Sequence, residues 1–498
     1  MIVVTALSFG LRFWHLERFD IFVFDEVYYV KFAQAYLAGM PEFDAHPPLG
    51  KYFIAAGIFL SKDLFLESPV SHRWMNALVG GLVPLLVMGI ALTLSELNTV
   101  TKQAAEQTQN PAQNPAKQWT FACLAGGFVA IDGLFITESR YALINIYLVF
   151  FGLLGHWLWL QAHLIQHQPQ RLPQRQQAAS PAVRVTVYRV LAGIALGCAI
   201  ATKWNAIGYL LSLLIWELYQ NNKLLRVSGR IPQIKALSRQ IAALCTYGIL
   251  IPAFTYSALW WPHLYLSKEH FIALHRTLLT FHLHLGTHSH SACSKWYTWP
   301  LLIKPIAYWY EKKGPWAYSV SNLGNPVLWW LSSAAIAVLA IAVAIGLAKA
   351  VVIFGKNVLS RQSFRQSFRQ SPRKPPSHAL SSSEETVKNN SLNGSWRNHP
   401  LAAYLLIGYA TNWLPWAVVG RCTFIYLYMP AVVFSFMTLA WLLSEWLYSP
   451  VNRPWAKTIS WIMLGAIALS FLFWLPLSLG LPLTSESLSW RWWLKSWI

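Results

Sequence analysis

The sequence predicts an all-α polytopic membrane protein, because it has few charges, long apolar runs and basic residues gathered in loops. Of the 498 residues, 55% are hydrophobic and 12% are charged, whereas a soluble domain carries about 25% charged residues. The run 327–354 is longer than the ~20 apolar residues that cross a bilayer core. Most of the net charge of +20 lies in polar loops between apolar runs. This placement argues against a nucleic-acid partner and favours loops that orient the chain in a lipid bilayer.

Apolar runs, taken as helices, predict about eleven transmembrane spans in a single integral-membrane domain, 1–498. Very short links at 137–140 and 202–203 predict tight turns between neighbouring spans. The first run has no small-residue cleavage site, so we predict that it is a signal anchor. The spans fall near 1–17, 74–95, 118–136, 141–162, 187–201, 204–220, 241–261, 327–354, 399–419, 423–447 and 458–478.

Five basic loops predict the orientation of the chain. Together they hold about 20 Lys and Arg and few acids, and with eleven spans all five lie on one side, which the positive-inside rule makes cytoplasmic. The first outer loop, 18–73, and the long outer loop, 262–326, then lie outside the plasma (inner) membrane. The repeat RQSFRQSFRQ predicts a disordered basic cytoplasmic loop at 355–398. The five basic loops are 96–117, 163–186, 221–240, 355–398 and 448–457.

The five cysteines indicate no covalent cross-link. Cys123, Cys198 and Cys245 fall in apolar runs, and none of the five shows the spacing of a metal site. We therefore predict neither a disulfide nor a zinc site, and small hydrophobic residues within spans instead.

The stretch FDEVYYVKFAQAYLAGMPEFDAHPPLGK, 24–51, crowds acids into the first outer loop. Carboxylates near lipid are costly unless they are paired, bound to a metal or functional. Asp25, with Glu26 beside it, is a candidate general base that removes a proton from an attacking hydroxyl. Asp44 and His46, next to a Pro-Pro pair, are candidate substrate-binding residues. The alternative is a solvated loop whose acids pair with nearby cations, namely Lys31, Lys51 or Arg73.

Three cations stand at the predicted outer ends of spans. Arg140 lies in ESRYALIN, Lys203 in TKWN and Arg421 in GRCTFIYLYMP. Together they are suited to bind a membrane-held anion such as a lipid phosphate, which arginine contacts through two donors. Glu138, in the same predicted turn as Arg140, is a further candidate substrate-binding residue. Each cation, taken singly, is also compatible with a side chain that reaches from a helix end to the membrane interface.

Histidines and aromatic residues mark the long outer loop. A dense histidine set can bind a metal or hydrogen-bond sugar hydroxyls, and HLHLGTHSH lacks the paired spacing of a structural zinc site. His282 and His288 are candidate substrate-binding residues. No cofactor is required by the sequence, but a divalent cation would bind Glu26 and a loop histidine such as His288. Trp296 and Trp299 suit either the membrane interface or stacking on sugar faces, and both interpretations stay open.

These segments, in this order, resemble the protein O-mannosyltransferase family over nearly the whole chain. FDE…FDAHPPLGK is similar to the first outer loop of the family and is the most specific match. Further segments that resemble the family are ESRYALIN, LGCAIATKWNAIG and HLHLGTHSHSACSKWYTWPLLIKPIAYWYE. The β-trefoil repeats that eukaryotic members carry in the long outer loop are absent, so the chain resembles the bacterial branch.

The resemblance implies a C-type glycosyltransferase fold with amphipathic helices in the outer loops, and inverting transfer from a polyprenyl-phosphate sugar. Asp25 matches the proposed catalytic base of the family and Glu26 its acidic neighbour, which we expect to orient Asp25, Arg140 or a divalent ion. Arg140 and Arg421 match arginines near the donor phosphate. Departures from the family leave the sugar and the acceptor open: Asn145 where Asp is common, Lys304 where Arg is common, and Tyr426-Leu427-Tyr428 where eukaryotic members have Tyr-His-Tyr.

We therefore predict mannose transfer from polyprenyl-phosphate-mannose to Ser/Thr hydroxyls of exported proteins at the extracytoplasmic face. The expected partners are this donor, the acceptor protein, the bilayer and the Sec translocon. The alternative is transfer of another lipid-linked sugar, such as an amino-arabinose, to lipid A or another envelope glycolipid. A transporter is disfavoured, because transporters place ionisable residues mid-span and show symmetric repeats. A non-catalytic binding protein is disfavoured by the presence of Asp25, Glu26 and Arg140.

Overall fold

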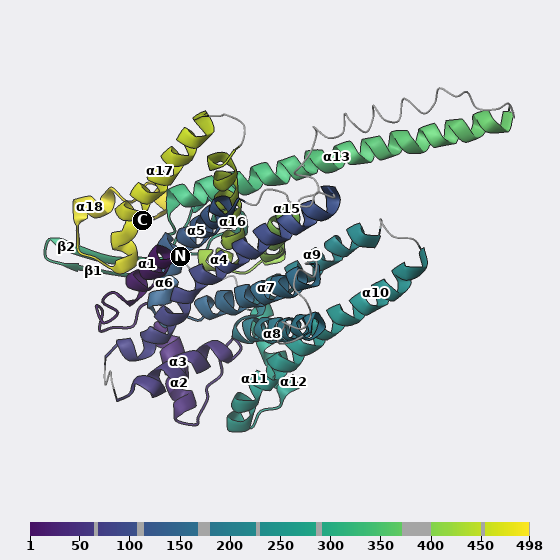
Figure 1. Ribbon diagram of the computed structural model, residues 1–498. Helices are drawn as coiled ribbons and strands as arrows, with labels where there is room; N and C mark the ends of the chain where they lie inside the picture. The colour runs from purple at the N-terminus through teal and green to yellow at the C-terminus, as the bar shows by residue number, and fades with distance from the viewer. Residues whose placement is uncertain are drawn as a thin grey trace.

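The computed structural model describes residues 1–63, 68–106, 114–167, 180–225, 230–284, 291–370, 400–449 and 454–497, and most of them are helical (Figure 1). Short 3-10 or π turns link several of the helices. The α-helices are α1 (Ile2–Phe13), α2 (Glu26–Leu37), α3 (Leu49–Ser61), α4 (Val70–Glu106), α5 (Pro115–Ile131), α6 (Gly133–Arg140), α7 (Asn145–His167), α8 (Pro181–Thr202), α9 (Ile207–Leu225), α10 (Arg230–Cys245), α11 (Ile251–Ser267), α12 (Phe271–His284), α13 (Pro326–Gln370), α15 (Pro400–Trp413), α16 (Met429–Leu447), α17 (Pro454–Leu479) and α18 (Ser485–Ser489).

Within the described ranges, seven helices are long and apolar enough to cross a membrane, or eight if the bent pair α5–α6 forms one span. The chain is therefore a multi-pass helical membrane protein, as predicted. Helices α1 and α3 are apolar but shorter, so the predicted count of eleven spans stays a prediction. The seven are Val70–Val100, Asn145–His167, Pro181–Thr202, Ser238–Ser267, Pro326–Gly346, Ile425–Leu447 and Pro454–Leu479.

A bend of 58° separates α5 from α6, and two buried charged residues satisfy the backbone groups that it frees. Asp132, at the bend, accepts a hydrogen bond from the amide three residues further on in α6 (3.4 Å). Arg12 of α1 donates to the carbonyls of Val129 and Ala130 at the end of α5 (3.4 and 3.3 Å). Helix ends buried in a membrane without such partners would leave polar groups unpaired. The bend is therefore stabilised by specific side chains.

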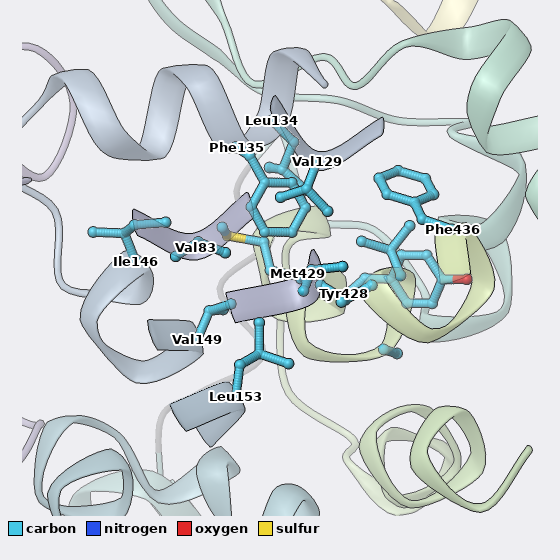
Figure 2. Close-up of a cluster of buried hydrophobic side chains, with 14 of the residues drawn as sticks. Val83, Val129, Leu134, Phe135, Ile146, Val149, Leu153, Tyr428, Met429 and Phe436 are labelled. Carbon is cyan, nitrogen blue, oxygen red and sulfur yellow. The ribbon is translucent and has the colours of Figure 1, made fainter. Parts of the chain in front are cut away.

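Helix α16 forms the centre of the bundle, with 94% of its most apolar stretch buried. It packs on α5, α13 and α15, and Figure 2 shows Met429 and Phe436 among apolar side chains from α4, α5, α6 and α7. Lipid tails are as apolar as these side chains, so close packing rather than the hydrophobic effect joins helices in a membrane. This packed centre fixes the helix ends at which the polar side chains gather.

One end of the bundle carries the first loop. We call it the first-loop face and define it by residues 14–63 and the turns at 141–144 and 203–206. Two of the predicted loop helices, α2 and α3, pack on each other there, and α3 also contacts α7 and α8. A Cβ on Gly50 would lie 2.7 Å from the Ile144 side chain, closer than atoms pack. The glycine of HPPLGK thus allows α3 to approach the turn that follows α6.

A small antiparallel sheet, not predicted from the sequence, lies at the same face. Strand β1 (Ala307–Lys313) pairs with β2 (Trp316–Ser321), which pairs with β3 (Leu483–Thr484). Gly314, between β1 and β2, takes φ +59°, a left-handed conformation that glycine adopts without strain. The sheet brings Tyr308 of β1 to the candidate site.

The loop 355–398, predicted to be disordered, is helical in its first part. Helix α13 continues to Gln370 and extends far beyond the other helices (Figure 1). The segment RQSFRQSFRQ consists largely of residues that a helix accommodates and contains no proline, so the helix continues until Pro372 approaches. The rest of the predicted loop lies outside the described residues.

Candidate active site

Asp25 stands at the N-terminal end of α2. Its backbone carbonyl accepts hydrogen bonds from the Tyr28 and Tyr29 amides (3.0 and 3.1 Å). The preceding residue, Phe24, takes φ +57°, a left-handed conformation that is an outlier for a bulky side chain. The Phe24 ring stacks on Tyr308 at 4.1 Å and an interplanar angle of 5°, which holds this backbone in place. The turn therefore presents a half-buried carboxylate at a helix end that favours negative charge.

The next residue, Glu26, is fully buried and heavily bonded. Its carboxylate accepts two hydrogen bonds from the Arg73 guanidinium (both 2.8 Å) and one each from the Val23 and Ala142 amides (both 2.9 Å). Burial is the largest single effect and raises the pKa of Glu26, but the charge and hydrogen bonds of Arg73, the nearby His72 and the Ala142 amide together lower that pKa below its usual value. We predicted that Glu26 orients the base, Arg140 or a divalent ion. Its contacts instead join the first loop to α4 and to the turn after α6.

A second buried ion pair closes the HPPLGK segment. The Lys51 ammonium donates to the Asp44 carboxylate (2.5 Å) and to the His46 carbonyl (2.7 Å). The Asp44 and Lys51 side chains are only 10% and 3% exposed. The alternative interpretation of the loop named the correct partners, because Glu26 pairs with Arg73, Asp44 with Lys51 and Glu42 with Lys31. Only the Glu42–Lys31 pair is solvated.

Helix α12 covers the first loop with its last turn. His282 Nε2 hydrogen-bonds the Ala45 carbonyl (2.8 Å), and its ring stacks on that of His46 (5.8 Å). Burial, and then the positive charges of Lys203 and Lys51, lower the pKa of His46 well below its usual value. The His46 imidazole is therefore neutral at pH 7. A neutral imidazole can donate a hydrogen bond to a sugar hydroxyl through one nitrogen and accept one through the other.

Glu138, near the end of α6, anchors a buried hydrogen-bond network. Its carboxylate accepts hydrogen bonds from three side chains, which are Tyr308, Asn145 (3.1 Å) and Asn322 (3.3 Å). The Asn145 side chain in turn accepts a hydrogen bond from the Lys203 ammonium (3.1 Å). Asn145 stands where the resembled family often has Asp, so the Lys203 charge meets a neutral amide at this point.

The chain reverses after α6, later than predicted. We predicted a tight turn at 137–140, but α6 includes all four of these residues and the reversal occurs at 141–144. Helix residues two positions apart do not face the same side. Glu138 and Arg140 therefore leave α6 in different directions, and only Glu138 joins the site network.

Arg140 closes the end of α1. Its guanidinium donates to four successive or near-successive carbonyls, those of Leu11 (2.9 Å), Arg12 (3.3 Å), Trp14 (2.6 Å) and His15 (3.1 Å). The last carbonyls of a helix have no partner within the helix, and a cation there satisfies them and complements the helix dipole. These contacts occupy both terminal nitrogens of Arg140, so we do not include it in the proposed phosphate site.

Replacing Arg140 by Ala is expected to lower the free energy of unfolding by about 1–3 kcal/mol, the cost of leaving buried polar groups unpaired. Thermal unfolding of the purified protein in detergent measures this change. Arg276→Ala, on the exposed face of α12, is the matched control and should change little. An Arg140→Ala protein that unfolds like wild type but loses donor binding would restore the predicted phosphate role.

Of the three cations predicted to bind the phosphate, Lys203 and Arg421 act on each other, and the charges of Asp25, Glu138 and Asp44 act on Lys203. Burial lowers the pKa of Lys203 to about 8, although the charges of Asp25 and Glu138 oppose this shift. The Arg421 charge contributes to the lowered pKa of Lys203, and also to that of His46. Among the described residues, none forms a hydrogen bond or ion pair with the Arg421 guanidinium. An arginine in this situation is well suited to bind an anion.

The two tryptophans of the long loop take different places. Trp299 is 0% exposed and its indole donates to the Ser294 hydroxyl (2.8 Å), so it is a core residue rather than a platform for sugar or lipid. Trp296 packs on Trp413 (4.9 Å) and lines a hollow of about 460 Å³ that Arg421 also lines. Only Trp296 is therefore placed to meet a ligand.

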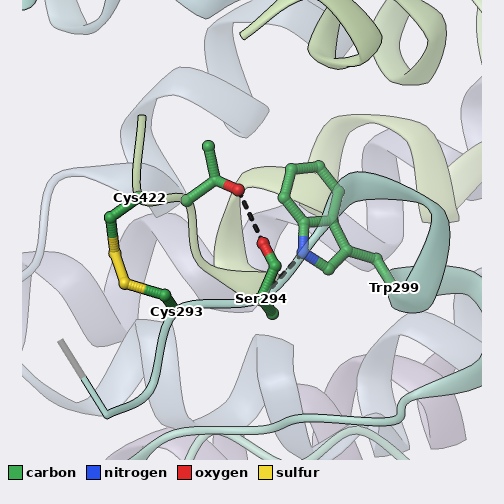
Figure 3. The surroundings of a disulfide bond; sticks show 5 residues. Cys293, Ser294, Trp299 and Cys422 are labelled. Carbon is green, nitrogen blue, oxygen red and sulfur yellow. Dashed lines mark hydrogen bonds between the residues drawn. A yellow bond between two sulfur atoms is a disulfide. The ribbon is translucent and has the colours of Figure 1, made fainter. Parts of the chain in front are cut away.

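The prediction that the cysteines form no disulfide is wrong. Cys293 and Cys422 are joined, with a Cα–Cα distance of 5.3 Å (Figure 3). This bond could not be predicted from the sequence, because the two residues are 129 positions apart and neither has a neighbouring cysteine. The other cysteines, Cys123, Cys198 and Cys245, are free.

The predicted divalent cation is untested by the structure. In the described ranges no group of three or more His, Cys, Asp and Glu side chains is arranged to hold a metal. His288, the loop histidine named for this role, lies outside those ranges. Glu26 is bonded to Arg73 and two amides, so the predicted pair of ligands has no support from the contacts of Glu26.

Several residues that shape the site were not among the predicted site residues: Phe24, Tyr308, Asn322 and Tyr426, of which Tyr426 was noted only as a departure from the resembled family. Tyr426 lies beneath the Lys203 ammonium, 5.0 Å from nitrogen to ring centroid. Phe24 and Tyr308 each fall inside a motif that resembles the family, which was the available signal. Asn322 had none, because it lies 184 positions from Glu138.

Apolar spans with carboxylates and cations gathered at one end define a membrane protein with a polar, charged site at one end of its helices. The chain belongs to the dolichyl-phosphate-mannose-protein mannosyltransferase family, whose sequence profile matches residues 2–101 and 112–267. The profile of the C-terminal four-transmembrane region of protein O-mannosyltransferase matches 267–371 and 378–497. The predicted family is thereby confirmed.

Curated relatives and a solved structure agree with this family. A polyprenol-phosphate-mannose–protein mannosyltransferase of Mycobacterium tuberculosis is 24% identical over 91% of this chain and 80% of its own. One of the same name from Corynebacterium glutamicum is 25% identical over 58% of each chain. The donor-bound protein O-mannosyltransferase Pmt1–Pmt2 complex of Saccharomyces cerevisiae aligns with a TM-score of 0.70 and 14% identity, over 100% of this chain and 92% of the other. This likeness confirms the predicted C-type glycosyltransferase fold.

Proposed function

We propose that this chain transfers mannose from polyprenyl-phosphate-mannose to Ser/Thr hydroxyls of exported proteins, with inversion at the anomeric carbon. The observation that carries the proposal is that the half-buried carboxylate Asp25 and the cation Arg421 both act electrostatically on the buried cation Lys203. Family membership and the names of the mycobacterial and corynebacterial relatives support mannose as the sugar, a polyprenyl phosphate as the carrier and a protein as the acceptor.

In the proposed reaction the donor phosphate lies between Lys203 and Arg421. Asp25 takes the proton of the acceptor hydroxyl, and the acceptor oxygen bonds to the anomeric carbon from the face opposite the phosphate. The bond from that carbon to the phosphate oxygen breaks, and polyprenyl phosphate leaves with the bonding electron pair. Because both cations stabilise the phosphate charge, the leaving group requires no general acid. The Glu138–Asn145 network holds Lys203 in position.

We also propose that the first-loop face is extracytoplasmic, in the plasma membrane. The Cys293–Cys422 disulfide, next to Arg421 of the site, supports the assignment, because disulfides persist in oxidising compartments and not in the cytosol. The basic composition of the loops predicted to be cytoplasmic agrees with it. An acceptor that arrives unfolded during export would meet the site there, which is the basis for the proposed association with the Sec translocon.

A transfer assay tests the function. The purified protein, in lipid vesicles, receives polyprenyl-phosphate-mannose with radiolabelled sugar and one of three acceptors: a Ser/Thr peptide, the same peptide with Ala at those positions, or lipid A. We expect label on the Ser/Thr peptide alone. Label on lipid A and none on the peptide would overturn the proposed acceptor and favour the glycolipid alternative.

Donor affinity is expected to fall as the pH rises through the pKa of Lys203. An amine is charged below its pKa, and the Lys203 pKa of about 8 places the loss of charge near pH 8, whereas the donor phosphodiester stays anionic throughout. We expect the KM for donor to rise about tenfold between about pH 7 and 9, as one titrating amine requires. In Lys203→Arg, which stays charged, the KM should be flat. An equal rise in both proteins would exclude Lys203 as the titrating group.

A further inference from the structure

We propose that the Cys293–Cys422 disulfide positions Arg421 for donor binding, so that donor affinity depends on the oxidised state of this bond. The inference rests on the proposed function, in which Arg421 contacts the donor phosphate. In this account the two cysteines act through Arg421 and touch neither substrate.

The backbone that carries Arg421 has little intrinsic order. Residues 419–424 form neither helix nor strand and lie between two short 3-10 turns, Leu414–Val418 and Ile425–Tyr428. A Cβ on Gly420 would meet no other atom within 4 Å, so this point of the chain is not closely packed. A segment of this kind samples many backbone conformations unless specific bonds hold it.

Three bonds tie this segment to the long loop, all within two residues of Arg421. Cys422 is joined to Cys293, the Ser294 amide donates to the Thr423 carbonyl (2.8 Å), and the Thr423 hydroxyl donates to the Ser294 carbonyl (2.6 Å; Figure 3). Ser294 is itself held by the indole of buried Trp299. We call Cys293, Ser294, Cys422 and Thr423 the clamp.

The clamp holds Arg421 in a different way from the buried arginines Arg140 and Arg73. Arg140 and Arg73 are fixed by hydrogen bonds from their own guanidinium groups, which leaves those groups occupied. Arg421 is fixed through its backbone, and its guanidinium has no hydrogen-bond partner among the described residues. A cation that is positioned but unoccupied binds a phosphate without a large loss of conformational entropy.

The clamp also shapes the hollow beside Arg421. The two clamped segments, 293–297 and 419–423, both line it, and its volume is about 460 Å³. Without the covalent bond the two segments are joined only by hydrogen bonds, so the hollow and Arg421 would lose their fixed relation. The expected consequence is weaker donor binding with little change in acceptor binding.

A double-mutant cycle tests the proposal. The four proteins are wild type, Cys293→Ser/Cys422→Ser, Arg421→Ala, and the combination, and the readouts are donor KM, acceptor KM, kcat and the affinity for polyprenyl phosphate by calorimetry. Loss of the disulfide should raise the donor KM about 3- to 10-fold, the size expected when one side chain and its loop lose preorganisation, and leave the acceptor KM unchanged. In the Arg421→Ala background it should change the donor KM no further. If the bond were merely structural, its loss would raise the KM of both substrates and would raise the donor KM equally with Arg421 present or absent. That result would overturn the proposal.

Dithiothreitol provides a second test if the cysteine variant fails to fold. It transfers two electrons and two protons to the sulfur–sulfur bond of the folded wild type, which becomes two thiols, while dithiothreitol is oxidised to its cyclic disulfide. This should raise the donor KM reversibly, whereas Cys123→Ser and Cys245→Ser should behave as wild type before and after treatment. Unchanged polyprenyl phosphate affinity after complete reduction would overturn the inference. If wild type transfers no mannose, the proposed function fails, but the calorimetric comparison still decides the role of the clamp. If wild type transfers and Arg421→Ala binds donor normally, both the phosphate assignment and the clamp inference fail.

Discussion

Replacing Asp25 by Asn is expected to slow mannose transfer by about 100-fold or more, the lower end of general-base contributions. Asn preserves the shape of the side chain but cannot accept the proton of the attacking hydroxyl. Since Asp25 does not hold the donor phosphate in the proposed reaction, polyprenyl phosphate affinity should stay within the wild-type range. Transfer to the Ser/Thr peptide under saturating donor measures the loss, and calorimetry with polyprenyl phosphate measures the affinity.

Glu42→Gln is the matched control for Asp25→Asn. Glu42 lies in the same loop, and its side chain is 45% exposed and paired with Lys31, so its loss should leave transfer unchanged. Strong transfer by Asp25→Asn would refute the base assignment. The search would then move to Asp44, which lies in the same site, because Glu26 is fully buried and bonded to Arg73.

The second large effect is expected at the Glu26–Arg73 pair, where Glu26→Ala should cost about 3–5 kcal/mol of unfolding free energy, the usual cost of breaking a buried ion pair. The mutation leaves the Arg73 charge without its partner in a region where both side chains are almost fully buried. It also removes the acceptor of the Val23 and Ala142 amides. We expect a large drop in yield and in the Tm of thermal unfolding in detergent.

The chain contains its own comparison for this prediction. The Lys31–Glu42 pair has the same 2.8 Å separation as Arg73–Glu26, but its side chains are 64% and 45% exposed. Glu42→Ala should therefore cost only about 0–1 kcal/mol. Equal losses for the two substitutions would contradict a stabilising role for the buried pair. A stable Glu26→Ala protein that transfers no mannose would return Glu26 to the catalytic site, as first predicted.

Much of the candidate site was predictable because its chemistry is local in the sequence. Asp25, Asp44 and His46 fall within one loop, and any fold of a membrane protein must either pair such acids or use them. The pairing partners Arg73 and Lys51 were also named in advance. The membrane class followed from composition alone, since long apolar runs with few charges have few other solutions.

The roles of the arginines were not predictable from the sequence. Arg140 and Arg421 both stand near the end of a predicted span and look alike in one dimension. Their contacts differ because of where the end of α1 lies in space. Its free carbonyls accept the hydrogen bonds of the Arg140 guanidinium, whereas Arg421 stands on an irregular segment. The disulfide and Tyr308 were missed for a related reason, since their partners lie 129 and 170 positions away.

The most direct test of the account is a structure of the protein with polyprenyl-phosphate-mannose bound to the inactive Asp25→Asn variant. We predict that the donor phosphate lies within hydrogen-bond distance of both Lys203 and Arg421, with the anomeric carbon facing residue 25 and Arg140 still bonded to the end of α1. A phosphate bound at Arg140, or an anomeric carbon turned away from residue 25, would contradict the central claim.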